Sequence, residues 1–210
     1  MSALLAQVVV MAGPSGSGKS HLAESSGLPV LELDHFYKDG DDPTAPRHHS
    51  LGIVDWDDVR SWNADKAIAA LDELCRTGRT EIPVYDIAQD RAVGAEPFAL
   101  DGAAAVIAEG IFSVELVAPL RERGLLADAI VVRRAAWKNF ARRLQRDLRE
   151  RRKPPATLVR RGLALMQAEE ATVQRQIALG CRPCDRHATA YALRHAARGE
   201  GLDGGAGRSA

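Results

Sequence analysis

The sequence predicts an α/β protein of three layers, in which a parallel central sheet lies between helices. Short apolar runs alternate along the chain with longer stretches of helical periodicity, the pattern of a sheet that helices cover on both faces. The first apolar run leads directly into a glycine-rich octapeptide, as expected where a buried strand turns into a helix. Apolar residues make up 46% of the 210 residues, enough for one substantial core and too little for two large enzyme domains.

The predicted strands are short runs of β-branched and other apolar residues. They cover residues 7–11, 30–33, 103–108 and 129–132. Residues 81–85 are expected to form a further short extended piece, which Pro83 limits because proline cannot donate a ladder hydrogen bond. Asp34 and Glu109 each follow one of these runs directly, so both carboxylates are expected at strand ends.

The predicted helices follow the strands. One is expected to begin near Lys19, and residues 63–77 carry a helical apolar stripe that Gly78 closes. Helical periodicity returns over residues 135–152 and 157–179, which Pro154 and Pro155 separate. Residues 39–58 are rich in Asp, Pro and His without periodicity, which indicates a loop over the site. We expect one domain over residues 1–198, a lid at about residues 135–160, and a disordered tail over residues 199–210.

Charge and cysteine content narrow the class of protein. The 28 basic and 28 acidic residues balance, so nucleic acid is not an expected partner and neither is a membrane surface. The charges are segregated, with ten Lys or Arg at residues 133–153 and eight Asp at residues 34–65. Three cysteines, an odd number, favour a reducing compartment. Because the chain shows no basic leader and no apolar run of membrane-spanning length, we expect a cytoplasmic protein.

The octapeptide matches the Walker A pattern of glycine, four residues, glycine, lysine and serine. Its glycines permit backbone torsions that turn consecutive N–H groups inward around phosphate oxygens. Lysine carries a charge to the outer phosphates, the serine hydroxyl is a ligand for Mg²⁺, and the following helix adds its positive dipole end. The predicted nucleotide-binding residues are Gly13, Pro14, Ser15, Gly16, Ser17, Gly18, Lys19 and Ser20.

Further segments follow the octapeptide in a fixed order: Leu-Asp-His-Phe-Tyr-Lys at residues 33–38, Asp-Trp-Asp-Asp at 55–58, Pro-Val-Tyr-Asp at 83–86, Glu-Gly-Ile at 109–111 and an arginine-rich stretch at 141–147. Taken together, residues 8–153 resemble the uridine kinase family, within the wider group that includes phosphoribulokinase and pantothenate kinase. The resemblance implies the fold of a P-loop kinase with a helical lid. It also implies an ATP-dependent phosphotransferase that uses Mg²⁺.

The resemblance implies that Asp34 is the general base that accepts the proton of the attacking hydroxyl. The position agrees with physical reasoning, since ligands bind at the carboxyl ends of the strands of such sheets, and phosphoryl transfer needs an oriented nucleophile. Glu109 would hold Mg²⁺ together with Ser20. By the same resemblance, Tyr37, Trp56, Asp57 and Tyr85 would contact the acceptor.

Arginines of the predicted lid recur at three- and four-residue spacing, which brings their like charges together on one helix. An anion would relieve the repulsion, and the guanidinium fork matches phosphate oxygens. The resemblance implies that Arg146 and Arg151 contact the nucleotide, with Arg146 acting in catalysis, and that Arg143 contacts the acceptor. Lid closure would exclude water, which otherwise competes as phosphate acceptor.

The implied acceptor is the 5′ hydroxyl of a nucleoside. Residues 85–91 correspond to the segment that contacts the base in the family, yet their sequence differs from the family pattern. Ile87 replaces an aromatic residue, and Asp90 replaces a histidine that donates to the base; a carboxylate only accepts. Pantothenate, nicotinamide riboside or another metabolite is therefore an alternative acceptor. A second alternative is a nucleotide-binding regulatory module without kinase activity. Whether the chain forms a homo-oligomer also stays open.

Plainer interpretations of the same residues also stay open. Asp34 could cap a helix, Glu109 could be an ordinary strand-end charge, and the lid arginines could form a solvated basic face. Cys181 and Cys184 form a single Cys-x-x-Cys with no second pair, whereas zinc needs four ligands. We expect a loop near the adenine pocket at these cysteines.

Overall fold

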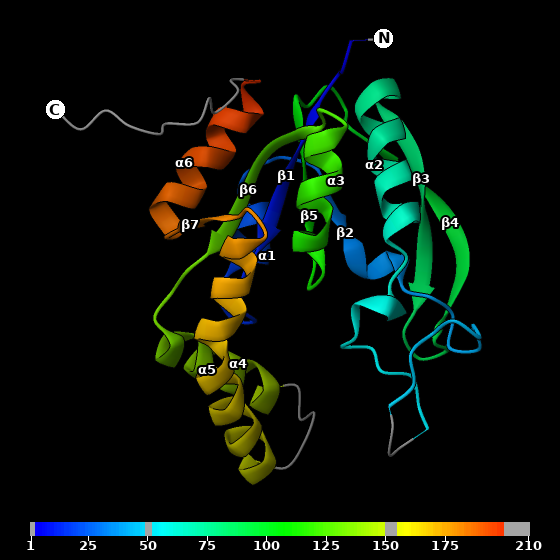
Figure 1. Ribbon diagram of the computed structural model, residues 1–210. Helices are drawn as coiled ribbons and strands as arrows, with labels where there is room; N and C mark the ends of the chain where they lie inside the picture. Colours follow the sequence, from blue (N-terminus) through cyan, green and yellow to red (C-terminus); the bar gives the residue numbers. More distant parts are fainter. Residues whose placement is uncertain (1–2, 49–51, 150–154, 200–210) are drawn as a thin grey trace, which may run out of the picture.

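The computed structural model describes residues 3–48, 52–149 and 155–199, and its main sheet has five parallel strands (Figure 1). In the order in which they lie side by side, they are β2 (Val30–Glu32), β5 (Ala105–Glu109), β1 (Gln7–Ala12), β6 (Leu126–Val132) and β7 (Arg182–Cys184). The first strand of the chain is therefore central, with later strands on both sides. Such a switch in strand order opens a crevice at the carboxyl ends of the strands.

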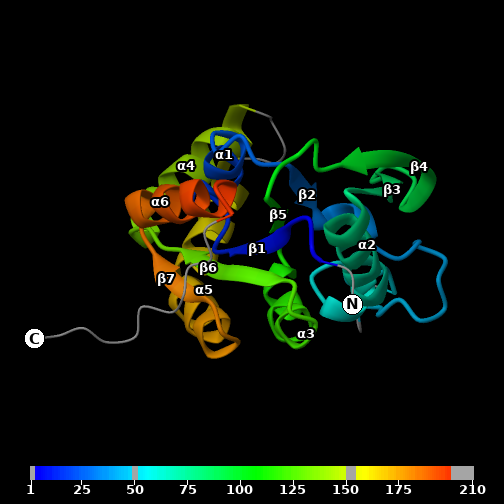
Figure 2. The ribbon, with the colours of Figure 1, turned by 90° about the horizontal axis from the view of Figure 1, so that it is seen from above.

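Side chains alternate across β1 and enter two separate cores. Val8 and Val10 pack in a core with the helices α2 (Ala64–Thr77), α3 (Val117–Glu122) and α5 (Pro155–Ala178). Val9 and Met11 pack in the opposite core with α1 (Lys19–Glu24) and α6 (Arg186–Ala197). Figure 2 shows the sheet between these layers. The predicted three-layer α/β fold is confirmed.

The helices predicted from local signals begin and end close to the expected residues. Helix α2 begins after Asn63, whose Oδ1 accepts from the Lys66 N–H, and it ends at Gly78, where φ is 83°. Helix α4 (Ala136–Arg149) and helix α5 occupy the two stretches of helical periodicity and pack against each other. Short 3-10 turns lie at Leu33–Phe36, Val59–Ser61 and Ser113–Leu116.

A β-hairpin stands beside the main sheet and was predicted only in part. Strand β3 (Arg79–Asp86) is longer than the expected piece at residues 81–85, because Pro83 lies within a two-stranded ladder instead of ending it. Its partner β4 (Arg91–Ala99) is exposed along almost its whole length and has no buried face to give an apolar pattern. The hairpin packs on α2, where Thr80 Oγ1 donates to Glu73 Oε2 over 2.6 Å.

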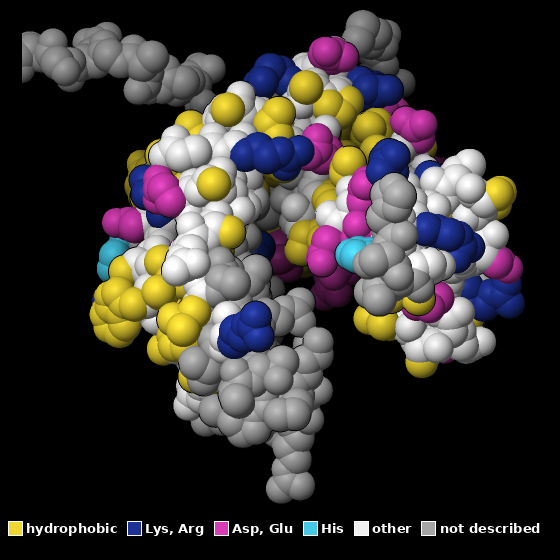
Figure 3. Space-filling view, turned by 60° about the horizontal axis from the view of Figure 1, so that its bottom comes forward, with side chains coloured by type: hydrophobic (Ala, Val, Ile, Leu, Met, Phe, Trp, Pro, Cys, Tyr) yellow, Lys and Arg dark blue, Asp and Glu magenta, His cyan; other side chains and the backbone are white. Residues whose placement is uncertain are grey.

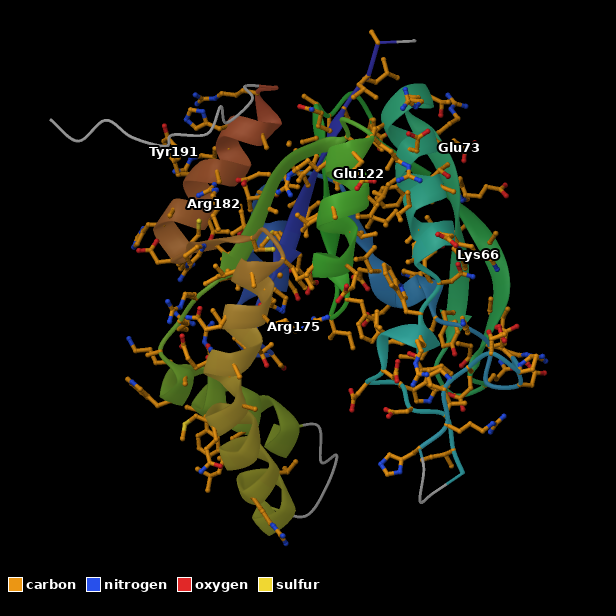
Figure 4. All side chains as sticks on the ribbon, viewed as in Figure 1. Lys66, Glu73, Glu122, Arg175, Arg182 and Tyr191 are labelled. Atoms are coloured by element: carbon orange, nitrogen blue, oxygen red, sulfur yellow. The ribbon has the colours of Figure 1, made fainter. Side chains whose placement is uncertain are left out.

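The prediction of a loop at residues 181–184 is wrong. Residues 182–184 form β7 at the edge of the sheet, and α6 follows with Asp185 as its N-cap. Arg182, labelled in Figure 4, donates to Asp128 at 2.6 Å and to Cys184 Sγ at 2.9 Å. Cys75, Cys181 and Cys184 are buried, and desolvation raises the pKa of each thiol.

Two expectations concern residues that the structure covers only in part. Residues 200–210 of the expected tail lie outside the described residues, as do residues 150–154 of the expected lid. Among the described helices, none combines the length and apolar character needed to cross a bilayer.

Candidate active site

The predicted phosphate loop, residues 13–20, lies between the end of β1 and the start of α1. Gly13 has φ 139° and Gly16 has φ 86°, in the region that L side chains rarely adopt. A Cβ on Gly13 would lie 2.9 Å from the Val132 carbonyl oxygen, and one on Gly16 would lie 2.8 Å from the Asn139 carbonyl oxygen. Only glycine fits at either position, because the loop packs directly against β6 and α4.

Lys19 and Ser20 both point toward Glu109. The Lys19 Nζ donates to the Gly13 carbonyl oxygen over 3.0 Å and lies 3.6 Å from Glu109 Oε1, while Ser20 Oγ donates to Glu109 Oε2 over 3.2 Å. Burial lowers the pKa of Lys19, and the charges of Glu109 and Asp34 oppose that shift. The Lys19 side chain is only 11% exposed, so this ion pair keeps a nearly buried charge neutralised.

Strand register explains why Glu109 reaches the phosphate loop. Glu109 is the last residue of β5 and pairs with Met11 of β1 on one side and with Glu32 of β2 on the other. Because Met11 lies only two residues before Gly13, the first residue of the loop, the Glu109 carboxylate lies at the carboxyl edge of the sheet beside Lys19 and Ser20.

Asp34 lies in the 3-10 turn that follows β2, and two contacts fix that turn. The indole Nε1 of the buried Trp62 donates to the Leu33 carbonyl oxygen over 2.8 Å. On the other side, a Cβ on Gly110 would lie 2.9 Å from Leu33 Cβ and 3.5 Å from Asp34 Oδ1. The glycine after Glu109 therefore lets the two strand ends approach closely, which brings Asp34 and Glu109 together.

The carboxylate of Asp34 belongs to a group of three with Glu109 and Glu32. Asp34 is open to solvent at the pocket surface, yet desolvation by the surrounding protein raises its pKa, and the charges of Glu109 and Glu32 raise it further. His35 and Lys19 act in the opposite direction. A raised pKa is the condition expected of a carboxyl group that acts as a base near neutral pH.

These groups line one pocket of about 540 Å³ at the carboxyl edge of the sheet. It brings together most of the phosphate loop with Asp34 and Glu109, which the sequence predicted. Glu32, His21 and Arg142 also line it and were not predicted as site residues. Glu32 could have been found, since it lies two residues before Asp34 at the end of the same strand. Figure 3 looks into the hollow at this end of the molecule, where acidic side chains gather in the wall.

The predicted acceptor-binding aromatics form a cluster beside Asp34. The Tyr37 ring lies 5.5 Å from that of Trp56 and 5.9 Å from that of Tyr85, between ring centroids. Burial raises the pKa of Tyr37, to which the charges of Asp34 and Asp57 add. Tyr37 and Tyr85 therefore stay protonated as hydrogen-bond donors, with the Tyr85 hydroxyl donating to the Lys38 carbonyl oxygen over 3.0 Å.

Helix α4, which falls within the residues predicted as a lid, lies against the phosphate loop. Helix α4 approaches Gly16 with the Asn139 backbone, and Arg142 Nη1 would lie 3.2 Å from a Cβ on Gly18. Arg143 and Arg146 lie on this helix, but the placement of their side chains is outside what the structure describes, and Arg151 is outside the described residues altogether.

A second pocket of about 490 Å³ lies at the other side of the phosphate loop, against Ser17. Its walls come from the end of β6 and from the start of α6, with Arg134, Arg186 and His187 among the lining residues. Ser17 lines this pocket and not the one that contains Lys19, so the loop separates a cationic pocket from one rich in carboxylates. The sequence analysis expected an adenine pocket near Cys184 but did not predict these lining residues, because α6 was not predicted.

One family model and several known proteins are similar to this chain. The model of the phosphoribulokinase and uridine kinase family matches residues 8–179. The chain is similar to uridine kinase of Saccharomyces cerevisiae, with 29% identity over 117 residues that make up 51% of this chain and 23% of that protein. It is also similar to inorganic pyrophosphatase TTM2 of Arabidopsis thaliana, with 25% identity over 159 residues, 72% of this chain and 21% of that protein. The chain thus spans less than a quarter of the length of these two relatives.

The fold is also similar to a solved structure, that of a candidate fructose transport system kinase from Silicibacter sp. TM1040. The TM-score is 0.52 at 22% identity, and the similarity covers 79% of this chain and 85% of that one. At this identity the likeness concerns the fold alone.

Proposed function

Because the chain belongs to the phosphoribulokinase and uridine kinase family, we propose that it is an ATP-dependent kinase that transfers the γ-phosphate to a hydroxyl group of a small molecule. The observation that carries the proposal is the single pocket in which the phosphate loop with Lys19 faces the Asp34 carboxylate. A cationic phosphate site opposite a base suits transfer to an alcohol, which needs positioning and charge stabilisation more than covalent help.

The nucleotide would bind along the phosphate loop. Loop N–H groups and the start of α1 are donors for phosphate oxygens, and Lys19 would exchange Glu109 for the outer phosphates. The cationic pocket at Arg134 and Arg186 lies at the other side of the loop and would receive the base of ATP. Arg146 and Arg151 would complete the phosphate contacts when the lid closes, and Arg143 would reach the acceptor.

The oxygen donors at the pocket fit a magnesium ion. Ser20 Oγ and Glu109 Oε2 lie 3.2 Å apart, and both are hard oxygen ligands. In the described part of the chain, no group of three or more His, Cys, Asp or Glu side chains could enclose a metal, so most of the other ligands would be water and phosphate, as Mg²⁺ prefers. When bound, the ion would neutralise charge on the phosphates.

Asp34 would orient the acceptor hydroxyl and accept its proton. It is well placed for this because Trp62 and Gly110 fix its turn beside Glu109, and its raised pKa favours proton uptake. Lys19 and Arg146 would stabilise the negative charge of the transferred group. Tyr37, Trp56, Asp57 and Tyr85 would hold the remainder of the acceptor.

The acceptor that we favour is a nucleoside, with its 5′ hydroxyl as nucleophile; pantothenate, nicotinamide riboside or a similar metabolite is the alternative. Support for a nucleoside comes from the aromatic cluster beside Asp34, which offers stacking surface to a planar base. We further propose that the protein acts in the cytoplasm as one domain over residues 1–198, with residues 135–160 as its lid.

ADP release tests the proposal. The purified chain is supplied with ATP, Mg²⁺ and, one at a time, uridine, cytidine, other nucleosides, pantothenate and nicotinamide riboside. A kinase releases ADP faster with at least one of these alcohols than without any. Tight binding of Mg-ATP by calorimetry with no stimulation across the panel would instead favour a nucleotide-binding regulatory module.

A further inference from the structure

Arg142 on α4 lines the phosphate pocket and is one of the residues there that the sequence did not predict. It is not one of the arginines to which the family resemblance gives a function, since those are Arg143, Arg146 and Arg151. Arg142 also lies at the pocket with α4 in the position that the structure shows. A role for Arg142 is therefore independent of those three residues.

Packing of α4 on the phosphate loop fixes the place of Arg142. The Asn139 carbonyl oxygen would lie 2.8 Å from a Cβ on Gly16, and Arg142 Nη1 would lie 3.2 Å from a Cβ on Gly18. Because residues three apart on a helix lie on the same side, Asn139 and Arg142 face the loop together. The guanidinium group thus lies beside the loop backbone at the residue that precedes Lys19.

The charge of Arg142 is not balanced by its surroundings. Its side chain is exposed, and no carboxylate of residues 3–48, 52–149 or 155–199 forms an ion pair with it. The neighbouring charges have the same sign, since burial lowers the pKa of Arg134 and the charges of Arg142 and Arg186 lower it further. An anion would relieve this repulsion, whereas Lys19 in the same pocket already has Glu109 as its counter-ion.

Arg142 lies toward the nucleotide side of the site, away from the proposed base. Besides burial, the pKa of Asp34 responds to four charged groups, which are Glu109, Glu32, His35 and Lys19. The charge of Arg142 acts instead on Arg134, which lines the second pocket, the proposed site for the base of ATP. Arg142 therefore lies where the phosphate pocket and the base pocket meet, and the α- and β-phosphates of a nucleotide would cross this place.

We propose that Arg142 binds the α- or β-phosphate of the nucleotide, the two phosphates that remain in ADP, in the arrangement of α4 that the structure shows. The planar guanidinium fork can donate two parallel hydrogen bonds to phosphate oxygens. The inference rests on the proposed function in taking the ligand to be ATP. It divides the cations of the site between two tasks, with Arg142 retaining the nucleotide and Lys19 at the outer phosphates.

The test is calorimetric titration of the full chain with ADP and, separately, with ATP, both with Mg²⁺ and without an acceptor. Arg142→Ala should weaken the binding of both nucleotides by the same factor, about tenfold to a hundredfold, because it removes charge-assisted hydrogen bonds to phosphates that both contain. Arg142→Lys keeps the charge without the fork, so its affinities should lie between those of the native chain and Arg142→Ala. In the kinase assay, Arg142→Ala should raise KM for ATP and leave kcat nearly unchanged.

The matched control is Lys138→Ala. It removes one positive charge from an exposed position of the same helix, outside the phosphate pocket, where Lys138 lies over the Trp137 ring. This variant should bind both nucleotides like the native chain.

Three results would overturn the inference: no binding of ADP by the native chain, unchanged ADP binding by Arg142→Ala, or weaker binding of ATP alone, which would place Arg142 at the transferred phosphate. The ADP titration involves no phosphate transfer and is therefore independent of kinase activity. If ADP binding depends on Arg142 but no acceptor stimulates ADP release, the inference stands and the proposed kinase function fails. If an acceptor stimulates release by the native chain and by Arg142→Ala with the same KM for ATP, the kinase function stands and the inference fails.

Discussion

Asn139 on α4 donates from Nδ2 to Glu169 Oε1 on α5 over 2.6 Å, and both side chains are buried. The Asn139 carbonyl oxygen also lies against Gly16 of the phosphate loop. Asn139 therefore links α4 and α5 to the site where phosphates would bind. Because a hydrogen bond between a buried amide and a buried carboxylate is costly to break, this contact should be sensitive to a change in either partner.

The first prediction concerns this contact. Asn139→Asp places a carboxylate against that of Glu169 with almost no change in shape, and it should destabilise the fold by about 3 kcal/mol, since buried like charges are poorly tolerated. The double variant Asn139→Asp with Glu169→Gln restores one amide and one carboxylate with the donor reversed, and it should recover most of the loss. Urea denaturation measures stability, and calorimetry with Mg-ATP shows whether nucleotide affinity follows. A double variant no more stable than Asn139→Asp alone would contradict a direct interaction.

The second prediction concerns Asp34. Asp34→Asn keeps the size of the side chain and removes the base, so acceptor-stimulated ADP release should fall by about 10² to 10⁴. Nucleotide affinity should change little, because the substitution leaves the phosphate loop intact. Retained turnover in this variant would show that another group is the base.

The third prediction is a pH dependence. A base must be unprotonated to act, and since the pKa of Asp34 is raised, activity should fall on the acid side at a pH above the usual range of aspartate. Glu32→Gln removes one of the charges that raise this pKa, so the acid limb of kcat/KM should move to lower pH. An acid limb at the same pH in both proteins would mean that Glu32 does not act on the base.

The fourth prediction separates packing from backbone strain in the phosphate loop. Gly16 and Gly27 have φ 86° and φ 75°, but a Cβ would meet the Asn139 carbonyl oxygen at Gly16 and nothing within 4 Å at Gly27. Both alanine variants carry the cost of positive φ, about 1 to 2 kcal/mol. Gly16→Ala should lose at least about 1 kcal/mol more because of the clash, and it should also lose nucleotide affinity. Equal losses in thermal denaturation would argue against tight packing of α4 on the loop.

The sequence predicted those parts of the fold that carry local signals. Strand β1 is an apolar run before glycine, and α2 carries a stripe with a cap at each end, so both were found within one residue of their ends. Strand β4 is exposed and β7 has three residues, so each depends on pairing with a distant partner that no local pattern reveals. Helix α6 was not predicted, although Asp185 is a good N-cap.

The same limit applies to the candidate site. The glycine spacing indicated Lys19, and the family resemblance together with the strand-end positions indicated Asp34 and Glu109; the structure places all three around one pocket. Glu32 belongs to no sequence motif. It joins the carboxylate group because β2 pairs with β5 in a register that places Glu32 beside Glu109. Gly40 also packs against Asp90, 50 positions further along the chain, and no local pattern in the sequence indicates that contact.

The ion pair between Lys19 and Glu109 means that β5 supplies a counter-ion to the phosphate loop. A nearly buried ammonium group without a partner would favour unfolding or deprotonation, whereas here the fold can persist before any ligand arrives. When a triphosphate binds, Lys19 would therefore exchange the Glu109 carboxylate for phosphate oxygens instead of only gaining a partner. The observed affinity will be the difference between two attractions, which permits tight recognition together with ready release of the product.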